Sequence, residues 1–139
     1  MELKAKDLRI GNLIWSGKSN DSTKEQPFGH WHKVISIGND DQKFEQIESE
    51  TEESFEWIFK DNWTGIPLTE DILLKCGFNK HHACMVLPLL TACCLIYAIK
   101  KREFFMDFNG IDVEYNLQYV HQLQNLYFAL TNKELEIEL

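Results

Sequence analysis

The sequence predicts an α+β protein in which a small N-terminal antiparallel β module precedes an antiparallel β meander packed on one long C-terminal helix. Three observations lead to this fold class. Residues 119–130 (YVHQLQNLYFAL) carry apolar residues at helical spacing. Asn109-Gly110 separates two runs of alternating apolar residues, which is the strongest short indication of a hairpin. Gly65-Ile66-Pro67 separates these features from an earlier set of short alternating runs, so we place one β-rich module at residues 1–64 and an α+β module at 65–139.

The first module is expected to be a small, strongly bent antiparallel sheet or barrel. Residues 8–15 (LRIGNLIW) predict a short strand with a bulge or tight bend at Gly11-Asn12. The polar stretch 17–26 predicts a mobile loop. Further strands are expected at residues 30–37, 43–47 and 55–59.

The second module is expected to begin with a short helix after Thr69. Thr69 is a suitable N-cap, Gly77 follows the predicted C-cap, and Phe78 is placed to fold back on Ile72 or Leu73 in a Schellman ending. The Asn-Gly hairpin predicts Phe108 opposite Ile111, Met106 opposite Val113 and Phe104 opposite Tyr115, with all six turned toward the long helix. Alternation of Leu135, Ile137 and Leu139 with glutamates predicts a final half-buried strand.

Residues 83–99 (ACMVLPLLTACCLIYAI) carry no charge and reach the lower length limit for a membrane span. Pro88, Thr91 and the β-branched LIYAI run favour a buried pair of strands, so we expect no membrane association. The chain also begins without an apolar signal core, and the adjacent Cys93 and Cys94 do not suit a disulfide scaffold. These observations predict a cytoplasmic protein.

The net charge is −8, from 14 basic and 22 acidic residues. Glutamates concentrate within residues 45–56, which contain no Lys or Arg and predict a solvated loop. An acidic balance argues against a nucleic-acid-binding surface spread over the whole molecule, because phosphate binding needs a Lys and Arg footprint. A local basic patch stays open as an alternative and would use Lys4, Lys6, Arg9, Lys33 and the run Lys100-Lys101-Arg102.

The long helix has an apolar stripe and an unusual second face. Tyr119, Val120, Leu123, Leu126, Tyr127 and Leu130 fall within an arc of about 120° that suits a core. The opposite side carries Phe128 among polar residues, and either the N-terminal sheet covers it or it anchors a partner protein or second subunit. We expect the first arrangement and keep the second as a hypothesis. The candidate partner surface consists of His121, Gln124, Asn125 and Phe128.

No catalytic or cofactor site is predicted. Cys76, His81, His82 and Cys84 have a spacing that fits no zinc template, and His30 and His32 are only distant additions. Cys93 and Cys94 lie in the most apolar run, where burial keeps thiols inert. The nucleophile-elbow, P-loop and dinucleotide motifs are absent. Asp107 and Asp112 could face each other across the hairpin, but such pairs usually flank turns in water.

Three blocks of the chain resemble an uncharacterised family of small proteins from gut bacteria, their prophages and mobile elements. The blocks are LRIGNLI near the start, IPLTEDILLKCGF at the centre and YVHQLQNLYFALTNKEL near the end. The resemblance implies an intracellular protein with no assigned activity, carried on a mobile element. It supplies no catalytic residue.

These patterns favour a non-enzymatic accessory or interaction protein without cofactors, acting on a protein partner or as a homo-oligomer. The alternative is a nucleic-acid-associated protein that uses the N-terminal β module and the local basic patch. A third class, an enzyme with His121 as acid or base, lacks a partner residue in the sequence.

Overall fold

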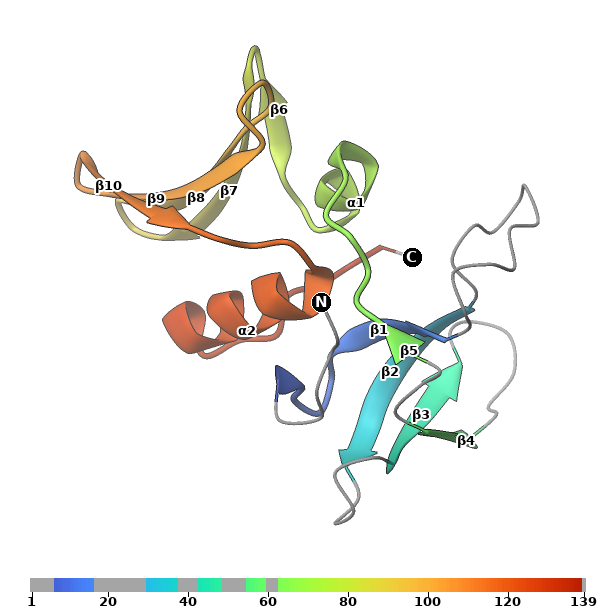
Figure 1. Ribbon diagram of the computed structural model, residues 1–139. Helices are drawn as coiled ribbons and strands as arrows, with labels where there is room; N and C mark the ends of the chain where they lie inside the picture. Colours follow the sequence, from blue (N-terminus) through green and yellow to red (C-terminus); the bar gives the residue numbers. More distant parts are fainter. Residues whose placement is uncertain (1–6, 17–29, 38–42, 49–54, 60–62, 139) are drawn as a thin grey trace. The chain divides into compact units, whose positions relative to one another are not determined.

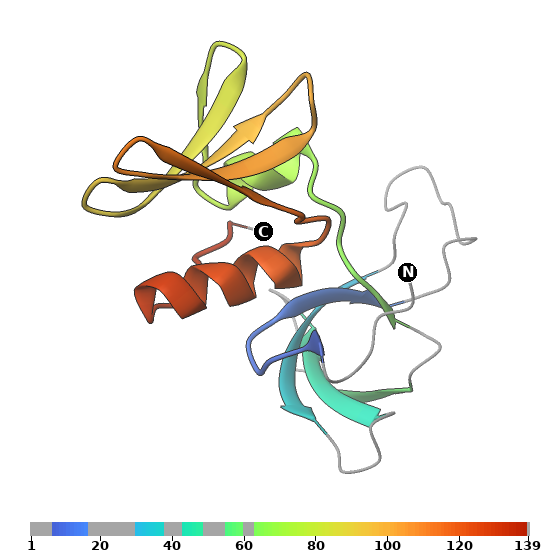
Figure 2. The ribbon, with the colours of Figure 1, turned by 60° about the vertical axis from the view of Figure 1, so that its left-hand side comes forward.

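The computed structural model describes residues 7–16, 30–37, 43–48, 55–59 and 63–138 of the chain. Two compact units divide it, Met1–Ile66 and Pro67–Leu139. The predicted boundary lay after residue 64, two residues earlier. The first unit is a β module, and the second combines a five-stranded antiparallel meander with two helices, so the α+β class is confirmed (Figures 1 and 2).

The first unit is one antiparallel sheet with the strand order β4-β3-β2-β1-β5. Strands β2 and β4 have the predicted bounds, and the two-residue strand β5 was not predicted. The bounds are Leu13–Ser16 for β1, His30–Ile37 for β2, Lys43–Glu48 for β3, Phe55–Phe59 for β4 and Trp63–Thr64 for β5.

The tight bend at Gly11-Asn12 is confirmed, but the predicted strand over residues 8–10 is wrong. The Asn12 backbone N–H donates to the Arg9 carbonyl at 3.0 Å, and the Arg9 N–H donates to Asn12 Oδ1 at 2.6 Å. Gly11 has a φ of +94°, which suits the left-handed position of such a turn. The turn is held to β2 because Gly11 donates to the Val34 carbonyl at 2.7 Å and Val34 donates back to Asn12. These backbone groups form hydrogen bonds within the turn and to Val34, and the strand begins only at Leu13.

The glutamate-rich segment is only partly the loop that its composition predicted. Glu45 and Glu48 lie on β3, and Glu56 lies on β4 opposite Gln46. Antiparallel pairing with neighbouring strands overrides the charge repulsion that favoured a loop. The rest of this segment, residues 49–54, and the predicted mobile loop at 17–26 lie outside the described residues.

The second unit carries its own sheet in the order β10-β9-β8-β7-β6, with every neighbouring pair antiparallel. The uncharged run 83–99 forms two strands joined by a turn at Thr91 and Ala92, as predicted. No helix among the described residues is both long and apolar enough to cross a membrane. The bounds are Asn79–His81 for β6, Cys84–Leu90 for β7, Cys93–Ala98 for β8, Glu103–Phe108 for β9 and Ile111–Tyr115 for β10.

Helix α1 spans Glu70–Lys75 and has both predicted ends. Thr69 Oγ1 accepts the backbone N–H of Ile72 at 3.3 Å, which caps the first turn. At the other end Phe78 donates to the Leu73 carbonyl and Gly77 donates to the Leu74 carbonyl, both at 3.1 Å. These two bonds are the Schellman pattern, and Gly77 has the required positive φ of +90°. The chain is thereby turned so that Phe78 enters the core beside Leu73.

Helix α2 spans Val120–Thr131, one residue later at each end than predicted. Gln122 Oε1 accepts the backbone N–H groups of Gln118 at 2.8 Å and Tyr119 at 3.1 Å, which satisfies two donors ahead of the first turn. Asn132 ends the helix in a left-handed conformation with a φ of 56°. An Asn side chain tolerates this conformation better than most, which explains why the helix ends at this residue.

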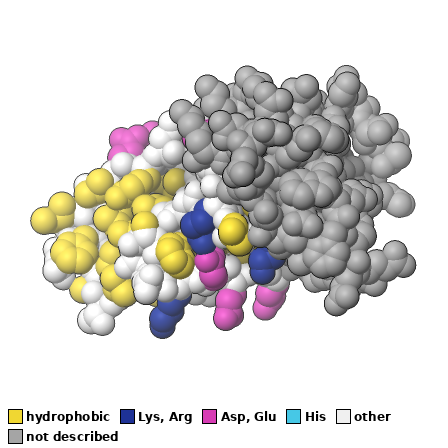
Figure 3. Space-filling view, turned by 90° about the horizontal axis from the view of Figure 1, so that it is seen from below, with side chains coloured by type: hydrophobic (Ala, Val, Ile, Leu, Met, Phe, Trp, Pro, Cys, Tyr) yellow, Lys and Arg dark blue, Asp and Glu magenta, His cyan; other side chains and the backbone are white. Residues whose placement is uncertain are grey.

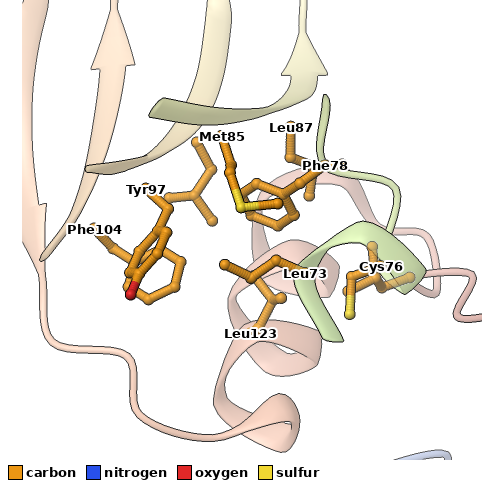
Figure 4. Close-up of a cluster of buried hydrophobic side chains, with 10 residues drawn as sticks. Leu73, Cys76, Phe78, Met85, Leu87, Tyr97, Phe104 and Leu123 are labelled. Atoms are coloured by element: carbon orange, nitrogen blue, oxygen red, sulfur yellow. The ribbon is translucent and has the colours of Figure 1, made fainter. Parts of the chain in front are cut away.

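The core of the second unit lies between the sheet and both helices (Figure 4). Leu73 of α1 and Leu123 of α2 are fully buried against the same face of the sheet. Phe104 meets Phe78 edge-to-face at a centroid distance of 6.4 Å and Tyr97 at 4.7 Å. Of the apolar stripe predicted on α2, Leu123 is in the cluster and Leu126 and Tyr127 pack against it. Val120, also in the stripe, is fully buried. The buried cluster comprises Leu73, Cys76, Phe78, Met85, Leu87, Leu95, Tyr97, Phe104, Leu123 and Leu135.

The predicted final strand is wrong for the described residues 134–138, which form no strand. Leu135 is nevertheless buried in the core and Ile137 packs against it, so the alternation was interpreted correctly as burial. The backbone N–H of Glu138 donates to the carbonyl of Lys75 at 2.9 Å, at the C-terminal end of α1. Carbonyls at a helix end lack partners within the helix, and here one of them binds the extended tail in place of a sheet edge.

Candidate interaction surface

The helix face predicted to bind a partner is largely withdrawn from solvent. His121 is 1% exposed and Gln124 is 3% exposed, whereas Asn125 and Phe128 are half-buried. The His121 ring stacks on Tyr119 at a centroid distance of 5.7 Å and an interplanar angle of 16°. Each of the four residues interacts with other groups of the chain. A partner could reach only Asn125 and Phe128 on this face as it stands.

The cysteine and histidine candidates are dispersed. Cys76 is buried at the end of α1, whereas His81 and His82 are exposed at the β6–β7 turn, and Cys84 sits opposite His81 on β7. Within the described ranges, no three His, Cys, Asp or Glu side chains come together to hold a metal ion. Burial raises the pKa of the Cys76 thiol to about 12, so this thiol stays neutral at physiological pH.

Asp107 and Asp112 face each other across the β9–β10 hairpin, as predicted. Asp107 Oδ1 accepts the Gly110 N–H at 3.0 Å and so supports the turn. On the neighbouring strand β8, Cys94 lies opposite Asp107. Burial raises the pKa of the Cys94 thiol, and the carboxylates of Asp107 and Asp112 add to the increase because they disfavour a neighbouring thiolate. The cross-strand row Cys94, Asp107 and Asp112 therefore favours the neutral, unreactive form of the Cys94 thiol.

A groove of about 680 Å³ lies in the second unit between the end of α1, Tyr127 of α2 and the C-terminal tail. Its lining includes the apolar side chains of Leu74, Leu87 and Leu135 and charged side chains of both signs, with Lys75 and Lys133 among the glutamates of the tail. The only thiol in its wall is Cys76, whose raised pKa leaves it a poor nucleophile. The groove can therefore hold an apolar group but offers no activated nucleophile among its lining residues.

The most exposed large apolar side chains on the sheet of the second unit lie at the end that carries the β7–β8 and β9–β10 turns. Cross-strand pairing aligns Leu90, Cys93, Phe108 and Ile111 in one row over β7 to β10. Three of these residues are exposed, Leu90 by 53%, Phe108 by 48% and Ile111 by 66%. Val113, in the next row on the same face, is 43% exposed. We call Leu90, Phe108, Ile111 and Val113 the apolar end of the sheet.

Sequence reasoning placed the apolar side chains of the hairpin against the long helix, and this is wrong for its outer half. Phe104 is 2% exposed and Met106 packs against the core, whereas Phe108 and Ile111 face solvent. The helices cover only part of the apolar face, and the turn of the β9–β10 hairpin stands clear of α2 in both views (Figures 1 and 2). The alternation of apolar and polar residues predicted the correct face of the hairpin. It contains no information on how far the helices extend over that face.

Figure 3 shows hydrophobic side chains gathered on the side of the second unit where Figure 1 places the hairpin turn and the C-terminal end of α2. An apolar area of this kind on a folded protein commonly marks a binding site. The basic run Lys100-Lys101-Arg102 is exposed in the β8–β9 turn. Of the other basic candidates, Arg9 and Lys33 belong to the first unit, and Lys4 and Lys6 lie outside the described residues.

No protein-family model, curated protein or solved structure matches the chain.

Proposed function

We propose that this chain is a non-enzymatic accessory protein that acts in the cytoplasm by binding another protein through the apolar end of the sheet. In line with the family that it resembles, we further propose that a prophage or mobile element carries its gene. The observation that carries the proposal is the exposure of Leu90, Phe108 and Ile111 in one cross-strand row, in which Cys93, between Leu90 and Phe108, is buried. Apolar surface exposed to water raises the free energy of the protein, and a partner that covers it lowers that free energy.

The position of this row also supports a binding role. The Asn109-Gly110 turn fixes the hairpin, because both residues have positive φ, 51° and 81°, as a type I′ turn requires. The row is therefore presented on paired strands of fixed register and not on a loop. A preorganised apolar surface loses little conformational entropy on binding, which favours recognition of a protein partner.

The experiment compares exposed leucine and isoleucine residues inside and outside the row. Tagged protein carrying Ile111→Ser or Leu90→Ser is purified from the cells that express it, next to Leu74→Ser as the matched control. Leu74 is 50% exposed on α1, so its substitution removes a similar apolar area from a different surface. We expect partner recovery to fall about ten-fold for the two row variants and to stay unchanged for the control.

Unfolding curves accompany the recovery measurement, because exposed side chains should each affect the free energy of unfolding by only about 0.5 kcal/mol. A photo-crosslinking amino acid at position 111 should then mark the partner directly, whereas the same group at Lys101 should not. Equal recovery in all variants, or equal loss in all of them, contradicts the proposal.

A second candidate function is nucleic-acid binding, which one observation favours: Lys100, Lys101 and Arg102 are all exposed in a single turn. Three neighbouring cationic side chains can contact the phosphates of a nucleic-acid backbone. A gel shift that weakens steeply with salt and is lost in a Lys100→Gln/Lys101→Gln variant would support this function. Binding that is insensitive to salt, or no binding at low salt, would exclude a phosphate-contacting role for the turn.

A further inference from the structure

Strand β10 is an edge strand, with only β9 beside it. In a hairpin with a two-residue turn, the pair next to the turn exchanges backbone hydrogen bonds, and such pairs then recur at every second residue. Ile111, Val113 and Tyr115 therefore bond to β9. The N–H and C=O groups of Asp112 and Glu114 point away from the sheet. Within the described part of the chain, no other strand pairs with this edge.

Apolar and acidic side chains alternate along β10, in step with the alternation of its backbone groups between the sheet and solvent. Ile111 and Val113 continue the apolar face, and Asp112 and Glu114 lie on the opposite face with Asp107 of β9. All four β10 residues named here are exposed. Residues 103–116 contain no Lys or Arg that could neutralise the carboxylates from within the hairpin. The edge therefore offers an apolar row and an acidic row to any strand laid beside it.

A second copy of the chain does not fit this edge. An antiparallel two-fold contact that keeps Ile111 and Val113 on one face must be centred on Asp112, Val113 or Glu114. These registers place Asp112 against Asp112, Asp112 against Glu114, or Glu114 against Glu114 of the other copy. Like charges directly opposite each other destabilise strand pairs. Charged residues on edge strands commonly prevent self-association in this way.

The opposite edge of the sheet is a weaker candidate. Strand β6 has three residues, Asn79–His81, and its Lys80 is engaged in a salt bridge of 3.2 Å with Glu70. It lacks the alternating apolar side chains of β10. Strand addition gains affinity from main-chain bonds and specificity from alternate side chains, and only β10 supplies both.

We propose that β10 binds an extended segment of a partner protein in which β-branched or aromatic residues alternate with Lys or Arg, added antiparallel as the next strand of the sheet. The basic residues lie opposite Asp112 and Glu114, and the apolar residue between them lies opposite Val113. The added segment also covers Ile111. This inference rests on the proposed function and specifies the chemistry of the partner.

The test uses three synthetic peptides of about nine residues, the length of a strand that overlaps β10 fully. One alternates Val with Lys, one alternates Val with Glu, and the third is the Val–Lys peptide methylated on the backbone nitrogen of each Lys. In an antiparallel pair these Lys amides would donate to β10, so methylation removes the main-chain bonds and keeps the charge. Binding is followed by NMR on the isotopically labelled full chain.

We expect the Val–Lys peptide to bind at least about ten-fold more tightly than the Val–Glu peptide, because two attractive cross-strand pairs replace two repulsive ones. The amide signals of Asp112 and Glu114 should shift, and their hydrogen exchange should slow. The methylated peptide should lose the interaction. The Asp112→Lys/Glu114→Lys variant, altered only at exposed positions, should reverse the preference between the first two peptides.

Several outcomes would overturn the inference: equal affinity for the Val–Lys and Val–Glu peptides, equal binding of the methylated peptide, shifts centred on β6 or the groove, or a dimer formed through β10 without any peptide. If the Val–Lys peptide fails while Ile111→Ser still abolishes partner recovery, strand addition is wrong and the proposed function stands. If Ile111→Ser also leaves partner recovery unchanged, both are wrong.

Discussion

Leu123→Ala tests the assignment of the core in the second unit. Leu123 lies on α2 with 0% exposure, in the cluster formed by both helices and the sheet (Figure 4). Truncation of a leucine at such a site removes its transfer free energy and leaves a cavity, which together cost about 3–4 kcal/mol. Leu74→Ala is the matched control, because it makes the same change in a helix at a side chain that is 50% exposed. Its expected cost is below about 1 kcal/mol.

The two units can be followed separately during urea unfolding. All four tryptophans, Trp15, Trp31, Trp57 and Trp63, belong to the first unit, and both described helices belong to the second. Far-UV circular dichroism therefore follows the second unit, and tryptophan fluorescence follows the first. With a urea slope near 1 kcal/mol per molar, Leu123→Ala should lower the dichroism midpoint by roughly 3 M or leave the helices unfolded without denaturant. Equal midpoints for Leu123→Ala and Leu74→Ala would refute the assignment of this core.

Three further predictions concern single positions in the second unit. Gly77→Ala should cost about 1–2 kcal/mol and Gly77→Asn less in urea unfolding, because a Cβ at residue 77 meets only an ordinary contact of 3.6 Å and the penalty comes from the φ of +90°. Equal costs for the two would point to crowding instead. Burial raises the pKa of the Cys76 thiol from 9.0 to about 12, so its contribution to stability is complete below pH 9 and is lost as the pH rises from 9 toward 12, where the unfolded thiol ionises first. The alkaline decline in the free energy of unfolding should be shallower in Cys76→Ala, and an identical slope in both proteins would contradict the assignment. Asp107→Asn should speed alkylation of Cys94 at neutral pH without changing that of Cys84, as measured by peptide mass spectrometry, because it removes a charge that raises the pKa of the Cys94 thiol while keeping the acceptor for Gly110. An unchanged ratio of the two rates would show that the charge of Asp107 does not contribute to the raised pKa of Cys94.

The features that sequence predicted correctly are those encoded within a few residues. Thr69 and Gly77 define both ends of α1 because capping needs only a hydroxyl and a left-handed glycine at fixed offsets. Asn109-Gly110 predicted every pair of the β9–β10 hairpin because a two-residue turn leaves one register. The ends of α1 and the register of the hairpin therefore follow from local chemistry.

The features that were missed depend on contacts between distant segments. Alternation showed that Leu135 and Ile137 are turned inward, but a strand edge and the end of a helix can both accept such a tail, and Lys75 supplied the acceptor. The helical wheel placed His121 and Gln124 on a polar face, yet both are buried in the folded chain. A wheel reports the direction of a side chain and not what lies in that direction. The exposed apolar side chains lie on the sheet instead.

The exposed row on β10 and the acidic residues between its members fit one physical explanation. Ile111, at 66% exposure, contributes little to the stability of the unit, and a long apolar edge is a hazard because it can pair with any other strand. Asp112 and Glu114 remove that hazard for strands of acidic or identical sequence, but they leave main-chain groups open and attract a basic strand. Replacing them by neutral residues would therefore broaden what the edge accepts, including copies of itself. The carboxylates act as a filter on an edge that is otherwise ready to pair, and selective pairing is the property that a binding strand needs.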